Sequence, residues 1–332
     1  MTGKSLQERF FNKIKGLVPP TTSFVDELAE LLDLSTDSVY RRMRNETPLT
    51  IDEIAVLCKR YRVSLDVESD STSDNVTFYY SKLKNTADFK AYLSRILFDM
   101  NEIKKASHKQ ITYAAIDIPI FHHFQFPQLA SFKVFYWLRG VMNDPVLHGK
   151  KFDNELIDKE LLEIGNEVYK SYCQIPTVEI WTNETINSQL EQIQYYWESG
   201  LFKSQEDALE ICELTREEIS LLQQQADCGS KMLDAEKRTD DNNYMLYQSE
   251  IEIGNNAIVV DKGEAKGIYI SCHTLNYMLT TQPRYCQETQ EWFDNLIRKS
   301  QLISGVSEKQ RYKFFKIALD KIDKLIEMIK VE

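Results

Sequence analysis

The clearest chemical pattern in the chain lies at residues 35–44, which read STDSVYRRMR. Three arginines, Arg41, Arg42 and Arg44, fall within four positions there. Arginine presents a planar fork of N–H donors that matches phosphate oxygens and the O6 and N7 edge of guanine. Successive side chains of a helix are about 100° apart, which places Arg41 and Arg44 opposite the apolar Val39. The pattern predicts a helix with one apolar face and one face that binds a polyanion.

The other polar residues of this stretch complete the predicted binding face. Asp37 stands four positions before Arg41, so its carboxylate is expected either to pair with that arginine or to accept a hydrogen bond from cytosine. Tyr40 is placed to contact a phosphate or a thymine methyl group. Arg42 is expected nearer the core side, where it would act by electrostatic steering. The predicted DNA-contacting residues are Ser35, Thr36, Asp37, Tyr40, Arg41, Arg42 and Arg44.

A helix must precede this face and position it. Ser23 is a suitable N-cap for a helix that buries Phe24 and Leu28. Asp33 follows in the turn, where a residue that tolerates the left-handed backbone is needed. Leu34 is expected to point into the core. Ser35 then caps the second helix.

Two further helices are expected around this pair. Residues 5–18 have apolar side chains at helical spacing, and Pro19 and Pro20 end the segment. Thr50 and Glu53 have the spacing of a capping box, which predicts the start of a closing helix. The sequence therefore predicts a small helical domain around residues 35–44.

Residues 24–65 resemble the lambda-repressor-like (XRE-type) helix-turn-helix family of bacterial transcription regulators. The resemblance rests on the small Ala29, the apolar Leu34 and Val39, and the closing capped helix. Asp33 departs from the pattern, because such motifs commonly have Gly at this turn. The resemblance implies double-stranded DNA as the partner, with the second helix of the motif in the major groove. The alternative is a small helical module that binds protein.

The composition predicts a globular protein of two or more domains, since the 332 residues are 42% hydrophobic. No run approaches the roughly 18 apolar residues of a membrane span, and the first ten residues lack the pattern of a signal peptide. We therefore expect a cytoplasmic protein without a membrane partner. The six cysteines form no CxxC pair, which indicates reduced thiols and excludes a zinc ribbon.

The net charge of −11 is unevenly distributed. Residues 1–66 hold ten basic and ten acidic residues, so the remaining 30 basic and 41 acidic residues carry the whole excess. Within residues 35–65, six basic side chains face four acidic ones. A local basic site of this size should bind DNA weakly and in a salt-sensitive way unless the protein dimerises.

The predicted fold is a mainly α helix-turn-helix domain at 1–66, a polar linker at 67–75, and a larger α+β domain at 76–332 with a C-terminal β-meander and two terminal helices. The meander is expected within 244–272, where GNN and KGEAKG separate three short strands. Other strands are expected at 76–80, 111–116 and 178–181. Helices are expected at 86–107, after Pro127, and at 154–173, 183–199, 204–234, 284–302 and 307–330.

No catalytic, metal or cofactor site is predicted. The chain lacks a phosphate-binding loop, a GxGxxG motif and a nucleophile elbow. His122 and His123 are adjacent, but no third ligand stands at an interpretable spacing. We therefore expect one of the two rings in the core and the other at the surface, and no enzyme activity.

Two alternatives remain for residues 76–332. The helix leading into ITYAAIDI and the later meander loosely resemble phospholipase D-like sensor domains, so an enzyme or a ligand-sensing domain targeted by the DNA-binding unit is the first. The HxKxxxxD signature of that family is absent, because Glu155 stands at the aspartate position after His148 and Lys150. The second is a protein-interaction module without a DNA role. In the DNA-binding interpretation, a small-molecule or protein effector would bind at 76–332.

The last helix bears on the oligomeric state. Its apolar residues follow the three-four spacing of a helix that packs on another helix, either within the domain or across a dimer. These residues are Phe315, Ala318, Ile322, Leu325 and Ile329. A homodimer is expected in either case, because two linked motifs raise DNA affinity through effective concentration.

Overall fold

In the computed structural model the chain divides into two compact units, Met1–Tyr79 and Tyr80–Glu332. The structure describes residues 5–16, 18, 23–61, 63, 75–233, 242–263 and 265–331. The predicted linker at 67–75 lies outside this part of the chain apart from Asn75, and so do Pro19 and Pro20.

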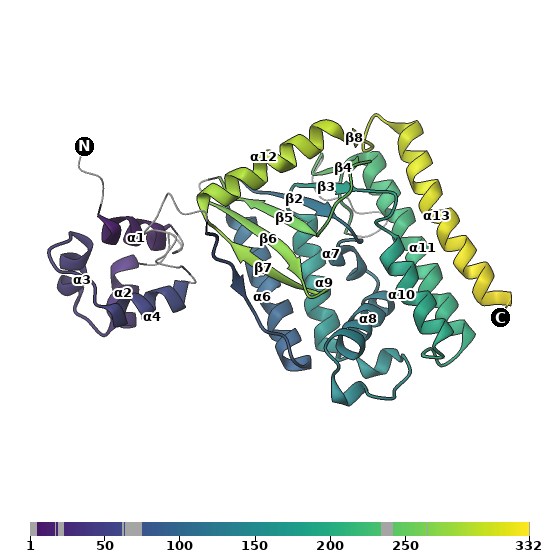
Figure 1. Cartoon of the computed structure of the whole chain (residues 1–332), viewed down its shortest axis with the longest axis horizontal. Helices are drawn as coiled ribbons and strands as arrows, with labels where there is room; N and C mark the ends of the chain where they lie inside the picture. Colours follow the sequence, from purple (N-terminus) through teal and green to yellow (C-terminus); the bar gives the residue numbers. More distant parts are fainter. Residues whose placement is uncertain are drawn as a thin grey trace. The chain divides into compact units, whose positions relative to one another are not determined.

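The first unit is helical (Figure 1). Its helices are α1 (Leu6–Lys15), α2 (Phe24–Leu32), α3 (Thr36–Met43) and α4 (Ile51–Tyr61). One small core unites them, with fully buried side chains from each helix, among them Phe10, Leu28, Val39 and Leu57. Leu34 packs against this core from the turn between α2 and α3, as predicted.

The helix starts in this unit follow the predicted caps. The Ser23 and Ser35 side chains accept hydrogen bonds from backbone N–H groups three residues on, which satisfies donors that the first turn leaves free. Thr50 and Glu53 form the reciprocal pair of a capping box, at 3.2 Å and 2.8 Å. Asp33 has the left-handed backbone expected in the turn, with φ 52°. These local predictions are confirmed.

The second unit is a mixed α/β structure on one eight-stranded sheet of order β1-β7-β6-β5-β2-β3-β4-β8. The strands are β1 (Tyr79–Tyr80), β2 (Gln110–Ala115), β3 (Thr177–Trp181), β4 (Tyr244–Gln248), β5 (Ala257–Asp261), β6 (Lys266–Cys272), β7 (Asn276–Thr280) and β8 (Gln301–Leu302). The main helices are α6 (Thr86–Lys105), α7 (Ile120–His123), α8 (Pro127–Tyr136), α9 (Lys159–Cys173), α10 (Asn187–Glu198), α11 (Gln205–Cys228), α12 (Pro283–Lys299) and α13 (Glu308–Val331). A π-helical turn at Trp137–Val141 and 3₁₀ turns at Pro145–Leu147 and Asn154–Leu156 connect them.

The predicted meander contains the wrong strands. β4 pairs in parallel with β3, at Thr177 opposite Tyr244, and two strands separate it from β5. The antiparallel meander is instead β5-β6-β7, and β7 was not predicted. The physical reason is that β2, β3 and β4 follow one another through helical crossovers, which places them side by side in parallel. Residues 249–256 then return the chain to the free edge of β2, so GNN is not a hairpin turn.

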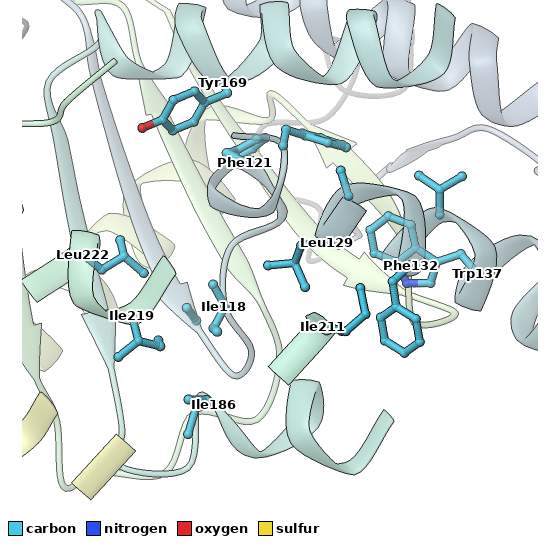
Figure 2. Close-up of a cluster of buried hydrophobic side chains, with 14 of the residues drawn as sticks. Ile118, Phe121, Leu129, Phe132, Trp137, Tyr169, Ile186, Ile211, Ile219 and Leu222 are labelled. Carbon is cyan, nitrogen blue, oxygen red and sulfur yellow. The ribbon is translucent and has the colours of Figure 1, made fainter. Parts of the chain in front are cut away.

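Helices cover the two faces of the sheet unequally. On one face the main core joins β2, β3 and β4 with α6 to α11 and α13. On the other face α12 buries Cys286, Phe293 and Leu296 against β2, β3, β5 and β6 (Figure 1). Figure 2 shows part of the main core, where Ile219 and Leu222 of α11 lie beside Ile118.

The apolar stripe of α13 is occupied within the unit. Its five predicted residues are all buried, and α13 packs along α11 (Figure 1). Internal packing therefore accounts for the three-four spacing.

Several helix bounds also differ from prediction. The expected helix at 154–173 starts at Lys159, and the one expected at 204–234 ends at Cys228, where Gly229 takes φ 66°.

The packing of α9 generates a stability prediction. A Cβ atom added at Gly165 would lie 2.5 Å from Cδ1 of Phe124, whose side chain is buried and cannot move aside freely. We expect Gly165→Ala to lower the free energy of unfolding by about 1–3 kcal/mol, the usual cost of overpacking. Urea denaturation would measure it. Gly254→Ala is the matched control, since a Cβ there meets nothing within 4 Å. Equal stability of the two variants would contradict the packing described here.

Candidate nucleic-acid interface

The exposed face of α3 carries most of the predicted contact residues. Val39 is buried, whereas half of Tyr40 is exposed, and the Arg41 and Arg44 side chains are 60% and 59% exposed. Ser35, Thr36 and Asp37 lie exposed at the start of the helix. The structure thus brings six of the seven predicted residues onto one end and one face of α3.

Contacts from α1 fix the chain that follows α3. The Gln7 side-chain amide donates to the carbonyls of Arg42, at 2.7 Å, and Thr47, at 2.9 Å. Its carbonyl oxygen accepts from the Leu49 N–H at 2.8 Å. Asn45 adopts φ 59°, which reverses the chain after α3. A single glutamine therefore holds the segment between α3 and α4, a role that the sequence analysis missed.

Arg42 is placed differently from the other six residues. Its guanidinium makes two hydrogen bonds to Glu53 of α4, at 3.1 Å and 2.7 Å, and both side chains are largely buried. Burial raises the pKa of Glu53, but Arg42 and the Thr50 N–H outweigh that effect and lower it. Arg42 therefore joins α3 to α4, and its geometry does not place it on the exposed face.

The two exposed arginines are also paired with acids. Arg41 Nε lies 3.2 Å from Asp37 Oδ2, the predicted spacing of four residues. Arg44 Nε lies 3.2 Å from Glu46 Oε1. Each pair is well exposed, so water screens it and it contributes little to stability. The face is therefore rich in donors but close to neutral.

A second polar cluster lies inside the second unit. Glu179, fully buried in the middle of β3, accepts hydrogen bonds from His122 Nε2 and Trp181 Nε1, both at 2.8 Å. The hydroxyls of Tyr172 and Tyr244 also donate to it. Burial raises the pKa of Glu179, but His122 and Tyr172 more than compensate and lower it. This arrangement favours the ionised carboxylate.

His123 forms a separate buried pair. Its Nδ1 lies 2.7 Å from Glu218 Oε1 of α11, and both residues are almost completely buried. The expectation that one of the two adjacent rings faces the surface is therefore wrong. Each ring meets a glutamate from a distant element, which compensates the cost of burying an imidazole. Lys133, buried nearby, donates to Gln192 at 2.7 Å, and burial lowers its pKa to about 8.

Lys231 is another buried basic residue of this unit. Its ammonium donates to the Ile175 carbonyl and to Thr177 Oγ1, both at 2.5 Å, and lies 4.0 Å from the centre of the Tyr172 ring. Burial lowers its pKa to about 7. The one sequence signal for this cluster was Glu179 itself, a charged residue inside the apolar strand TVEIW. Its donors come from α7, α9 and β4 as well as from β3 itself, so spacing along the chain could not pair them.

Comparisons with protein-family models, with curated proteins and with solved structures find no match to this chain.

Within the described ranges, no group of three or more His, Cys, Asp or Glu side chains is arranged to hold a metal ion. His148, Lys150 and Glu155, the positions compared with the HxKxxxxD signature, are all exposed. No helix in the described part of the chain is both long and apolar enough to span a membrane.

The placement of Arg42 gives a prediction that separates it from Arg41. Arg42→Ala leaves the largely buried Glu53 without its partner, so we expect the free energy of unfolding of the first unit to fall by about 1–3 kcal/mol. Arg41→Ala removes only an exposed pair and should change it by less than about 0.5 kcal/mol. Urea denaturation followed by circular dichroism would test both. Similar losses in the two variants would show that Arg42 has no special structural role.

Lys231 gives a prediction for the pH dependence of stability. Its folded pKa of about 7 lies below the usual lysine pKa of about 10.4, so the unfolded chain binds more protons between these pH values. The free energy of unfolding should therefore rise with pH, with this lysine contributing about 1–2 kcal/mol between pH 7 and pH 8.5. In Lys231→Met that contribution should vanish and the slope should flatten. Parallel profiles of the two proteins in urea denaturation would contradict the prediction.

Proposed function

We propose that this chain is a sequence-specific DNA-binding transcriptional regulator that inserts α3 into the major groove. The observation that carries the proposal is the exposed face of α3, where Tyr40, Arg41 and Arg44 project from a helix anchored by Val39 in the core. Its eight residues span about 12 Å, a length that fits within the groove. The resemblance of residues 24–65 to XRE-type regulators supports the same proposal.

Each exposed residue has a role in this proposal. Arg41 and Arg44 contact guanine edges or phosphates, and Tyr40 contacts a phosphate or a thymine methyl group. Ser35 and Thr36 lie at the N-terminus of α3, where N–H groups and the helix dipole favour a phosphate. Arg42 contributes indirectly, because its pair with Glu53 holds α4 against α3.

The second unit would provide dimerisation or the sensing of a small-molecule or protein effector. A dimer raises the affinity of a nearly neutral reading face, because both motifs bind at once. The apolar stripe of α13 packs within the unit, so the proposed dimer would use another surface. No residue of this unit is assigned to catalysis in the proposal.

Selection of duplexes from a random pool by the full-length protein, at stated salt, would test the proposal. We expect recovery of a palindrome with half-sites about one helical turn apart. Arg41→Ala and Arg44→Ala should each weaken binding to that site, by about 1–3 kcal/mol if the lost contact is a bidentate base contact. Loss of a phosphate contact should instead weaken all sequences alike.

Arg95→Ala is the matched control, because Arg95 in the second unit also pairs with an acid four residues away, Asp99. It should leave DNA binding unchanged. If no duplex is enriched, or if both α3 variants bind as well as the control, the proposal fails. A protein partner would then be the alternative for this surface.

A further inference from the structure

Every arginine of α3 is engaged by a carboxylate. Arg42 is held by Glu53 inside the unit, and Arg41 and Arg44 pair with Asp37 and Glu46 on the exposed face. Both exposed acids are themselves open to solvent, at 71% and 52%. A surface that served only to attract phosphate would gain nothing from these two carboxylates. The positions of Asp37 and Glu46 beside the two arginines therefore need a different explanation.

We propose that Asp37 and Glu46 are specificity-determining residues, which restrain Arg41 and Arg44 until a matching base sequence releases them. The inference rests on the proposed function and adds a selection step to it. Without DNA, the acids neutralise the arginines and make the face a weak ligand for phosphate. On a matching site, a donor group on a base edge takes the place of the arginine.

In this proposal, Asp37 is the residue that distinguishes a matching base from a non-matching one. A carboxylate only accepts hydrogen bonds, so in the major groove it finds partners in cytosine N4 and adenine N6. Guanine O6 and N7 and thymine O4 are acceptors and would repel it. With cytosine or adenine opposite Asp37, Arg41 becomes free for a guanine or a phosphate. With guanine or thymine there, the carboxylate stays paired with Arg41 and that contact is lost.

Replacing the carboxylate by a DNA group as the partner of Arg41 or Arg44 requires little free energy. The Asp37–Arg41 and Arg44–Glu46 pairs are exposed and lie at 3.2 Å, and pairs of this kind are weak because water and salt screen them. The Arg42–Glu53 pair is different, since it is shielded and doubly hydrogen-bonded, and it should stay closed on DNA. Two of the three arginines are therefore releasable, and they are the two that project from α3.

The competing account is that Asp37 only stabilises α3. An acid in the first turn of a helix interacts favourably with the helix dipole. That role would change the melting temperature of the first unit when Asp37 is replaced. It would change neither the base preference nor the number of counterions released on binding.

The test compares Asp37→Asn, Glu46→Gln and the control Glu30→Gln in the full-length protein. Glu30→Gln removes one negative charge from an exposed position on α2. For Asp37→Asn and Glu46→Gln we expect roughly fivefold to tenfold tighter binding to random duplex at 0.1 M salt, because one more cation meets a phosphate. The slope of log affinity against log salt should steepen by about 0.9. The control should show neither change.

Duplex selection with Asp37→Asn provides the second readout. Asparagine both donates and accepts, so guanine and thymine should be tolerated at one base pair of each half-site where the natural protein excludes them. If the natural protein enriches a site but Asp37→Asn and Glu46→Gln match the control in salt slope and base preference, the inference is wrong and the proposed function stands. If the natural protein enriches no duplex, both are wrong.

Discussion

The second unit depends on the burial of one carboxylate. Glu179 lies in the middle of β3 with no exposed surface, and an unpaired charge there would cost several kcal/mol. His122 of α7, Tyr172 of α9, Trp181 of β3 and Tyr244 of β4 all donate to it. These donors can reach one acceptor only if α7, α9 and β4 are all in place. The network therefore fixes the neighbours of β3 more specifically than apolar packing would.

The first unit uses charge in a different way. The shielded pair of Arg42 with Glu53 ties α3 to α4, whereas the exposed pairs of Arg41 and Arg44 are weak and exchangeable. Apolar side chains from all four helices form the small core, and the capping side chains of Ser5, Ser23, Ser35 and Thr50 define where the helices start. The contacts that support α3 are therefore buried, whereas those on the face that α3 exposes are open to solvent. The proposed DNA-reading role needs both properties.

The two units also divide the charge of the chain. The net charge of −11 belongs to the part after residue 66, while residues 1–66 are balanced. In the proposed function, an acidic second unit would discourage non-specific contact with nucleic acid and leave any attraction to the local face of α3. The charge of the whole chain would then favour selectivity over affinity, as the acids on α3 are proposed to do.

The sequence determined the features that depend on near neighbours along the chain. Ser23, Ser35 and the Thr50–Glu53 box set the helix starts, and 3.6-residue periodicity separated Val39 from Tyr40, Arg41 and Arg44. These interactions span three or four residues, so spacing alone encodes them. The tertiary structure decided what depends on distant partners: the parallel placing of β4 beside β3, the withdrawal of Arg42 onto Glu53, and the burial of both His122 and His123. Strands of similar pattern can pair in several orders, and each of these two histidines is buried against a glutamate from a distant element, so these outcomes follow from the packing of the whole unit.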